Sequence, residues 1–185
     1  MTATGDNILA QNHQGFEKVL VSEKPSADLG DAANVYGWLV GGWKMRIVDY
    51  ADGGSKREQD GEWHFAWVLE GRAIQDVLVV PTGKRNASME KAGNRYGCSL
   101  RVYDEELGAW KVRWNNPVTG AEDNLIGRRV GERIVQEGSD KSCNKIRWNF
   151  DDIKPDSFHW TGERSYDGGK TWKFEVEFFG ERMKR

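Results

Sequence analysis

The sequence predicts an all-β protein, and within that class an up-and-down antiparallel β-barrel of about ten strands with a short N-terminal helix. Apolar residues alternate with polar ones in one segment after another, which is the period of a strand with one buried face. The chain has 22 Gly, nine Trp and only four Pro, a composition typical of many short strands joined by tight turns. Closing such a meander removes its exposed edges, so we favour a barrel over the alternative, a β-sandwich.

The 185 residues are enough for one domain with a sizeable core. Residues 1–25 are polar and show no sustained period, so we expect a mobile N-terminal arm or a strap on the barrel surface. Residues 26–185 are expected to form a single barrel domain. It begins with a short helix within residues 26–40, for which Ser26 is the expected N-cap.

The first strand is expected to start at Trp43, after Gly41 and Gly42 end the helix. The segment from Glu62 to Val80 then predicts a central β-hairpin, because apolar side chains occupy every second position before Glu70-Gly71. Gly71 supplies the positive φ that a two-residue loop requires. That loop sets the cross-strand pairs, which are Trp63 with Leu78, Phe65 with Asp76 and Trp67 with Ile74.

Further strands follow with the same alternation. Their expected ranges are 96–102, 110–114, 124–130, 132–136, 146–150, 158–160 and 172–178. Within 96–102 we place Tyr96, Cys98 and Leu100 on the inner face, whereas the faces of 124–136 stay unassigned. The loop 81–94, rich in Gly, Lys, Asn and Ser, is a candidate lid over one end of the fold.

All eight Trp residues of the predicted strands fall on the apolar face of their own strand. Aromatic side chains line small-molecule cavities because they offer wide, rigid contact, and ten strands enclose more space than side chains fill easily. We therefore expect a ligand cavity inside the barrel, with a packed core as the alternative. The candidate ligand-binding residues are Trp63, Phe65, Trp67, Arg72, Asp76, Tyr96, Trp114, Asn116, Trp148 and Trp160.

Asp76 is the expected polar group of this cavity, because it is the carboxylate that the hairpin places among aromatic side chains. Burying an unpaired carboxylate is costly, so such a residue either meets a ligand or accepts structural hydrogen bonds. In the first case Asp76 is a candidate general acid or base. In the second case it pairs with Arg72 or with a backbone N–H.

Composition excludes several classes of function. The formal charge is −2 and the basic residues are scattered, so we expect no nucleic-acid partner. No apolar run is long enough to span a membrane and the start lacks the pattern of a signal peptide, so we expect a cytoplasmic protein. Cys98 and Cys143 share no metal-type spacing and are expected to be free thiols.

We expect no metal and no cofactor. His64 and His159 fall on the face opposite the Trp residues, whereas a haem ligand requires an inward histidine, so haem is disfavoured. Phosphate-binding loops, dinucleotide fingerprints and Ser-His-Asp elbows are missing from the sequence.

At Gly41-Gly42-Trp43 the chain resembles the calycin superfamily, which includes the lipocalins, fatty-acid-binding proteins and nitrobindins. The resemblance extends in strand order over about residues 35 to 185 and is greatest to uncharacterised bacterial lipocalin-like domains, which share the Leu-x-Gly-Arg turn found here at 69–72. It implies a lipocalin-like barrel in which a basic residue of the last strand packs over the Trp of the Gly-x-Trp motif. Arg182 is the matching residue.

Three functions follow as hypotheses. The first is binding of a hydrophobic, aromatic or polycyclic small molecule inside the barrel. The alternative is a cofactor-free isomerase, cyclase or lyase that uses Asp76 as general acid or base, and the third is carbohydrate binding by Trp stacking. The outer strand faces are charged, so any homodimer is expected to form through a sheet edge or the N-terminal helix.

Overall fold

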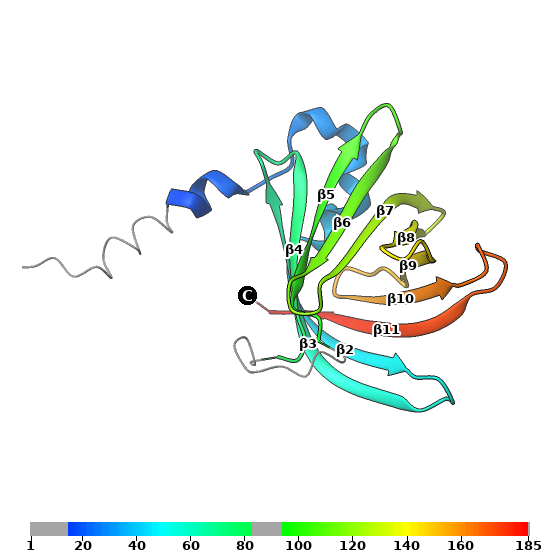
Figure 1. Cartoon of the computed structure of the whole chain (residues 1–185). Helices are drawn as coiled ribbons and strands as arrows, with labels where there is room; N and C mark the ends of the chain where they lie inside the picture. Colours follow the sequence, from blue (N-terminus) through cyan, green and yellow to red (C-terminus); the bar gives the residue numbers. More distant parts are fainter. Residues whose placement is uncertain (1–14, 83–93, 185) are drawn as a thin grey trace, which may run out of the picture.

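The computed structural model describes residues 15–82 and 94–184, and within them the chain forms a closed antiparallel barrel of ten strands (Figure 1). The expected lid, 81–94, and the expected N-terminal arm lie largely outside the described residues. The barrel strands are β2 (Gly41–Tyr50), β3 (Lys56–Val68), β4 (Ala73–Val79), β5 (Gly97–Asp104), β6 (Ala109–Asn116), β7 (Ala121–Val130), β8 (Arg133–Asp140), β9 (Lys145–Asp151), β10 (Ser157–Ser165) and β11 (Lys173–Arg182). Each strand pairs with the next along the chain.

The barrel closes where β11 pairs with β2, from Val176 opposite Asp49 to Arg182 opposite Trp43. Because the last strand completes the sheet against the first, no edge is left for a second sheet. The prediction of an all-β up-and-down barrel is confirmed, and the β-sandwich alternative is wrong. No helix in the described part of the chain is long and apolar enough to cross a membrane.

A helical segment precedes the barrel, as expected, but it is three short pieces rather than one amphipathic helix. These are η1 (Ala27–Ala32), α2 (Ala33–Tyr36) and η2 (Gly37–Leu39). Ser26 is the N-cap and its side chain accepts from the Asp28 backbone N–H at 3.4 Å. Gly30, at φ 48°, interrupts the helical backbone, which limits the length of each piece.

A two-residue strand, β1 (Val21–Ser22), connects the N-terminal region to the barrel by pairing with the end of β3. The chain then passes over the turn between β3 and β4. A Cβ at Gly71 would lie 2.4 Å from the Lys24 carbonyl oxygen and 2.5 Å from the Ser26 nitrogen. Gly71 is therefore required by this close approach as well as by its φ of 81°.

The register of the central hairpin is the predicted one, with Phe65 opposite Asp76 and Trp67 opposite Ile74. The turn is longer than expected, because the ladder ends at Val68 and Ala73 and Leu69 and Glu70 both take positive φ, 53° and 57°. Arg72 is thereby part of the turn on the barrel surface rather than the last residue of an inner face.

Two predicted faces are wrong. In β5 the inner side is the polar one: Ser99 and Arg101 are buried, whereas Val102 is 39% exposed. The reason is that Arg101 pairs with Asp76 inside the barrel, which outweighs the apolar preference of the other face. In β11 a register shift opposite Gly162 and Glu163 changes the alternation, so Trp172 and Phe174 do not join the core.

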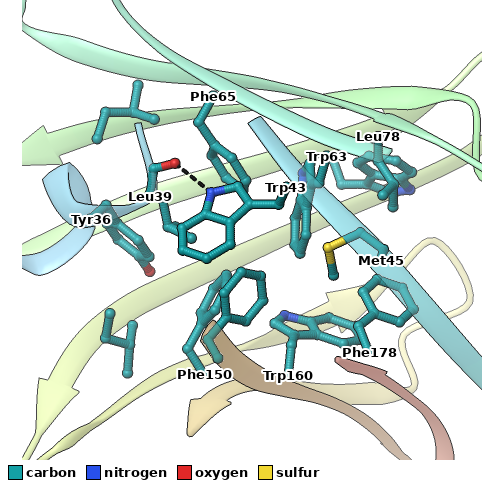
Figure 2. Close-up of a cluster of buried hydrophobic side chains, with 14 of the residues drawn as sticks. Tyr36, Leu39, Trp43, Met45, Trp63, Phe65, Leu78, Phe150, Trp160 and Phe178 are labelled. Carbon is teal, nitrogen blue, oxygen red and sulfur yellow. Dashed lines mark hydrogen bonds between the residues drawn. The ribbon is translucent and has the colours of Figure 1, made fainter. Parts of the chain in front are cut away.

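The aromatic core joins the helical pieces to the strands (Figure 2). Tyr36 and Leu39 are fully buried there, and the Trp43 indole N–H donates to the Leu39 carbonyl oxygen at 2.7 Å. Trp43 lies edge-on to Phe158, with ring centroids 4.8 Å apart. Burying each such side chain stabilises the fold by about 1.5–3 kcal/mol, so this packing holds the helical segment on the barrel.

Candidate functional site

A cavity of about 300 Å³ lies within the barrel, toward the strand ends that are remote from the helical pieces. Strand β10, for example, begins in the aromatic core at Phe158 and reaches the cavity through Trp160, Gly162 and Arg164. The interior is therefore divided: one part is the packed core that the alternative predicted, and the other is an open cavity.

Four indoles and one phenyl ring line this cavity: Trp63, Trp114, Trp148, Trp160 and Phe178. Trp160 is central to them, because it stacks on Phe178 at 4.4 Å and lies 5.7 Å from Trp148 and 6.3 Å from Trp63 between ring centroids. Rings that pack on one another in this way hold their orientation without a ligand. The wall is thus preformed by rings that pack on one another around Trp160.

Two of these indoles carry an unused hydrogen-bond donor. Trp63 and Trp160 are 4% and 5% exposed, and their Nε1–H groups have no partner in the part of the chain that the structure describes. A buried donor without a partner costs free energy, and native proteins usually satisfy it with a water molecule or a ligand.

The polar part of the cavity lining consists mainly of charged side chains: Arg95, Asp123, Glu163, Arg164 and Glu175. Arg164 donates from Nε to both carboxylate oxygens of Glu175, at 3.0 and 3.1 Å, and also pairs with Asp140. Arg95 pairs with Asp49 on β2. Both guanidinium groups are therefore engaged by carboxylates of the protein itself.

Asp123 differs from these residues, because it forms no ion pair or side-chain hydrogen bond with the described residues. It lies on β7 between Trp114 of β6 and Asp140 of β8. Burial raises the pKa of Asp123 to about 6, and the negative charge of Asp140 adds to the effect while Arg164 opposes it. This carboxyl titrates near neutral pH.

Asp140, the neighbour of Asp123 across the ladder, is held ionised. Its burial acts to raise the pKa, but hydrogen bonds from Asn144 and Ser142 and the charge of Arg164 outweigh burial and lower it. Two adjacent carboxyls with pKa values displaced in opposite directions are a common feature of ligand and active sites.

The predicted site residues fall into two groups. Five of them line the cavity: Trp63, Trp114, Asn116, Trp148 and Trp160. The others do not contribute to this lining, namely Phe65, Trp67, Arg72, Asp76 and Tyr96. Phe65 and Trp67 pack in the core, and Arg72 forms ion pairs with Asp28 and Glu70 on the surface. Asn116 also accepts from the Val118 and Thr119 backbone N–H groups, so it shapes the turn beside the cavity.

Asp76 forms an internal ion pair with Arg101, and both residues are 1% exposed. Its other oxygen accepts from the Ser99 backbone N–H at 3.1 Å. The backbone partner that we considered is thus present, but the cation is Arg101 and not Arg72. The Arg101 guanidinium also lies 5.3 Å from the Tyr36 ring centre, so the pair is built into the wall of the core.

Sequence reasoning missed Asp123 and Arg164. A signal for Asp123 existed, since Leu125 is buried and lies two residues further along the same strand, which puts Asp123 on the inner face. Arg164 continues the inward alternation of Trp160 and Gly162 on β10. Its role depends on carboxylates of two other strands, which sequence alone does not bring together.

The two described histidines lie away from the cavity. His64 pairs with Glu62 at 3.0 Å, and His159 pairs with Glu177 at 2.9 Å and stacks on Phe179. In the described ranges there is no group of three or more His, Cys, Asp or Glu side chains that could hold a metal ion. Neither histidine is among the described residues that line the cavity.

Comparison with known proteins extends to the fold alone. No family model matches the chain, and no curated protein is detectably similar in sequence. Among solved structures, Rv2717c from M. tuberculosis has a TM-score of 0.57 at 14% identity, over 85% of this chain and 100% of that one. The S-type phycobiliprotein lyase CPES from Guillardia theta has a TM-score of 0.57 at 11% identity, over 83% and 93%. At these identities the likeness shows the fold alone, and the closed ten-stranded barrel fits the calycin-like fold that the resemblance at Gly41-Gly42-Trp43 implied.

Proposed function

We propose that this protein binds a small aromatic molecule in the cavity lined by the four indoles. The observation that carries the proposal is the preformed aromatic wall around an open volume of about 300 Å³ inside an otherwise packed barrel. Aromatic walls with a few polar groups are typical of ligand sites, and this volume is at the small end of their range. It favours a ligand of one or two rings over an extended polycycle.

The proposal is tested by native mass spectrometry of the purified protein, followed by calorimetric titration with one- and two-ring aromatic compounds. Trp148 is partly buried, lines the cavity and packs against Trp160, so Trp148→Ala removes one wall of the cavity. We expect it to weaken binding about tenfold, the effect of losing one well-packed aromatic contact.

Trp172→Ala is the matched control. Trp172 lies outside the cavity, beneath the Arg147 guanidinium at 3.9 Å, and its loss should leave affinity unchanged. Equal effects of the two substitutions, or no binding by the wild-type protein, would show that the cavity is not the binding site.

Acid–base catalysis in the same cavity is the second candidate, and the position of Asp123 favours it. A carboxyl with a pKa of about 6 at an aromatic wall suits a general acid or base at neutral pH. In this candidate Asp123 takes the role first assigned to Asp76, which is enclosed with Arg101. Product analysis with a bound compound is the test: Asp123→Asn would abolish turnover while sparing affinity.

Carbohydrate binding on exposed indoles receives no support, because six of the nine Trp residues are buried. A cytoplasmic location and a homodimer remain predictions from the sequence.

A further inference from the structure

We propose that the cavity selects aromatic ligands that carry a positive charge, and that Asp123 is the residue that binds the charged group. This inference rests on the proposed function, since it concerns the same cavity. The charged side chains of the lining are of two kinds: some form ion pairs with other residues that the structure describes, and one does not.

The two cations that the described residues contribute to the lining, Arg95 and Arg164, both have carboxylate partners. Arg164 is held between Glu175 and Asp140, and Arg95 pairs with Asp49. Glu163 lies 3.7 Å from Arg147 of β9. An anionic ligand would therefore have to displace a carboxylate of the protein before it could bind either guanidinium, which makes the cavity a poor anion site.

Asp123, in contrast, is a negative group that a positively charged ligand can pair with directly. It is the charged residue of the lining without an ion-pair partner within the described ranges, and it lies directly across the ladder from Trp114. A cation held there would meet a carboxylate beside the Trp114 indole, and indole rings attract positive charge electrostatically. Both attractions are stronger in a partly buried site than in water.

The neighbours of Asp123 reinforce this selectivity. Four charges of the described residues act on its pKa: Glu122 of β7, Asp140 of β8 and Glu175 of β11 are negative, and Arg164 of β10 is positive. The surroundings thus disfavour the ionised form of Asp123 when the cavity is empty. A bound cation reverses this, because it compensates the charge that the neighbours oppose.

The affinity for a cation should consequently depend on pH. The preference for a cation requires ionised Asp123, and with a pKa of about 6 roughly one tenth of the protein is ionised there at pH 5. We expect cation affinity to fall about fivefold between pH 7.5 and pH 5, toward the affinity of the neutral ligand. The affinity for a neutral ligand of the same shape should not change.

The test compares three probes of one shape by calorimetry at pH 7.5: 1-naphthylmethylammonium, 1-naphthylmethanol and 1-naphthoate. We expect the ammonium compound to bind about tenfold tighter than the alcohol, since hydrogen bonds to charged groups are the strong ones, and the carboxylate to bind weakest. Asp123→Asn should bring the ammonium compound and the alcohol to within about twofold of each other.

Glu132→Gln removes the same charge from the exposed turn between β7 and β8 and should keep the preference. The wild-type titration at pH 5 gives a second test that needs no variant. If no probe binds, the proposed function fails. If the probes bind with equal affinity, or if Asp123→Asn keeps the preference for the cation, binding stands and the inference is overturned.

Discussion

The guanidinium carbon of Arg182 lies 4.1 Å from the centre of a Trp43 ring, across the end of the barrel that the helical pieces cover. The same guanidinium donates to the Val40 carbonyl oxygen at 3.1 Å and to the Trp38 carbonyl oxygen at 2.7 Å. One side chain of the last strand therefore joins the first strand of the barrel to the segment that precedes it. Closure of the barrel and attachment of the helical pieces are linked through this residue.

We expect Arg182→Lys to lower the free energy of unfolding by about 1–3 kcal/mol, because an ammonium cannot reproduce the fork that serves two carbonyls and the ring. Arg46→Lys is the control: Arg46 lies 4.0 Å over the Phe179 ring on the barrel surface and should cost under about 1 kcal/mol. Urea denaturation followed by circular dichroism measures both. Equal losses would show that Arg182 acts only as a surface cation.

The Arg101–Asp76 pair is expected to be a structural element. Arg101→Met would leave the Asp76 carboxylate buried without its cation, at a cost of about 3–5 kcal/mol. Arg72→Met, which breaks an exposed pair with Asp28, should cost less than about 1 kcal/mol. The same denaturation experiment compares the two variants. Similar losses of free energy of unfolding would mean that the internal ion pair stabilises the protein no more than the exposed one.

Gly127 provides the space for the Tyr36 hydroxyl. A Cβ at residue 127 would lie 2.1 Å from Tyr36 Oη, whose proton is donated to Gln136 at 3.1 Å. Gly127→Ala should therefore destabilise the protein by about 2 kcal/mol or more. In a Tyr36→Phe background the oxygen is absent, and the same substitution should cost at least about 1 kcal/mol less. A double-mutant cycle without such coupling would contradict this contact.

Asp123 is expected to lower stability at neutral pH. Its folded-state pKa of about 6 is above the ordinary value of 3.8, so between about pH 4 and pH 6 the folded state binds the proton more tightly than the unfolded state. Stability falls as pH rises through this window, and the full cost is present above it. Asp123→Asn should raise the free energy of unfolding by about 1 kcal/mol at pH 7.5, allowing for partial solvent exposure, and have little effect at pH 4. Equal changes at the two pH values would argue against a raised pKa.

The alternation of apolar residues was sufficient to predict the ten-stranded barrel and the register of the central hairpin. It also predicted four of the five aromatic residues that line the cavity, because burial stabilises an aromatic side chain and so favours the inner face of a strand. The partnership of Trp43 and Arg182 followed from the Gly-x-Trp resemblance. These features depend on local period and on one short motif, and both are present in the linear sequence.

Other features were decided by residues that meet only in the folded barrel. The polar side of β5 faces inward because Arg101 finds Asp76 across the sheet, and a register shift opposite Gly162 turns Trp172 away from the core. Asp123 acquires its chemistry from Trp114, Asp140 and Arg164, which belong to three other strands. The period of apolar residues specifies which residues of a strand share a face. Long-range strand pairing decides which charges and cavities that face meets. The sequence therefore indicated an aromatic cavity, and only the tertiary structure showed its acidic group.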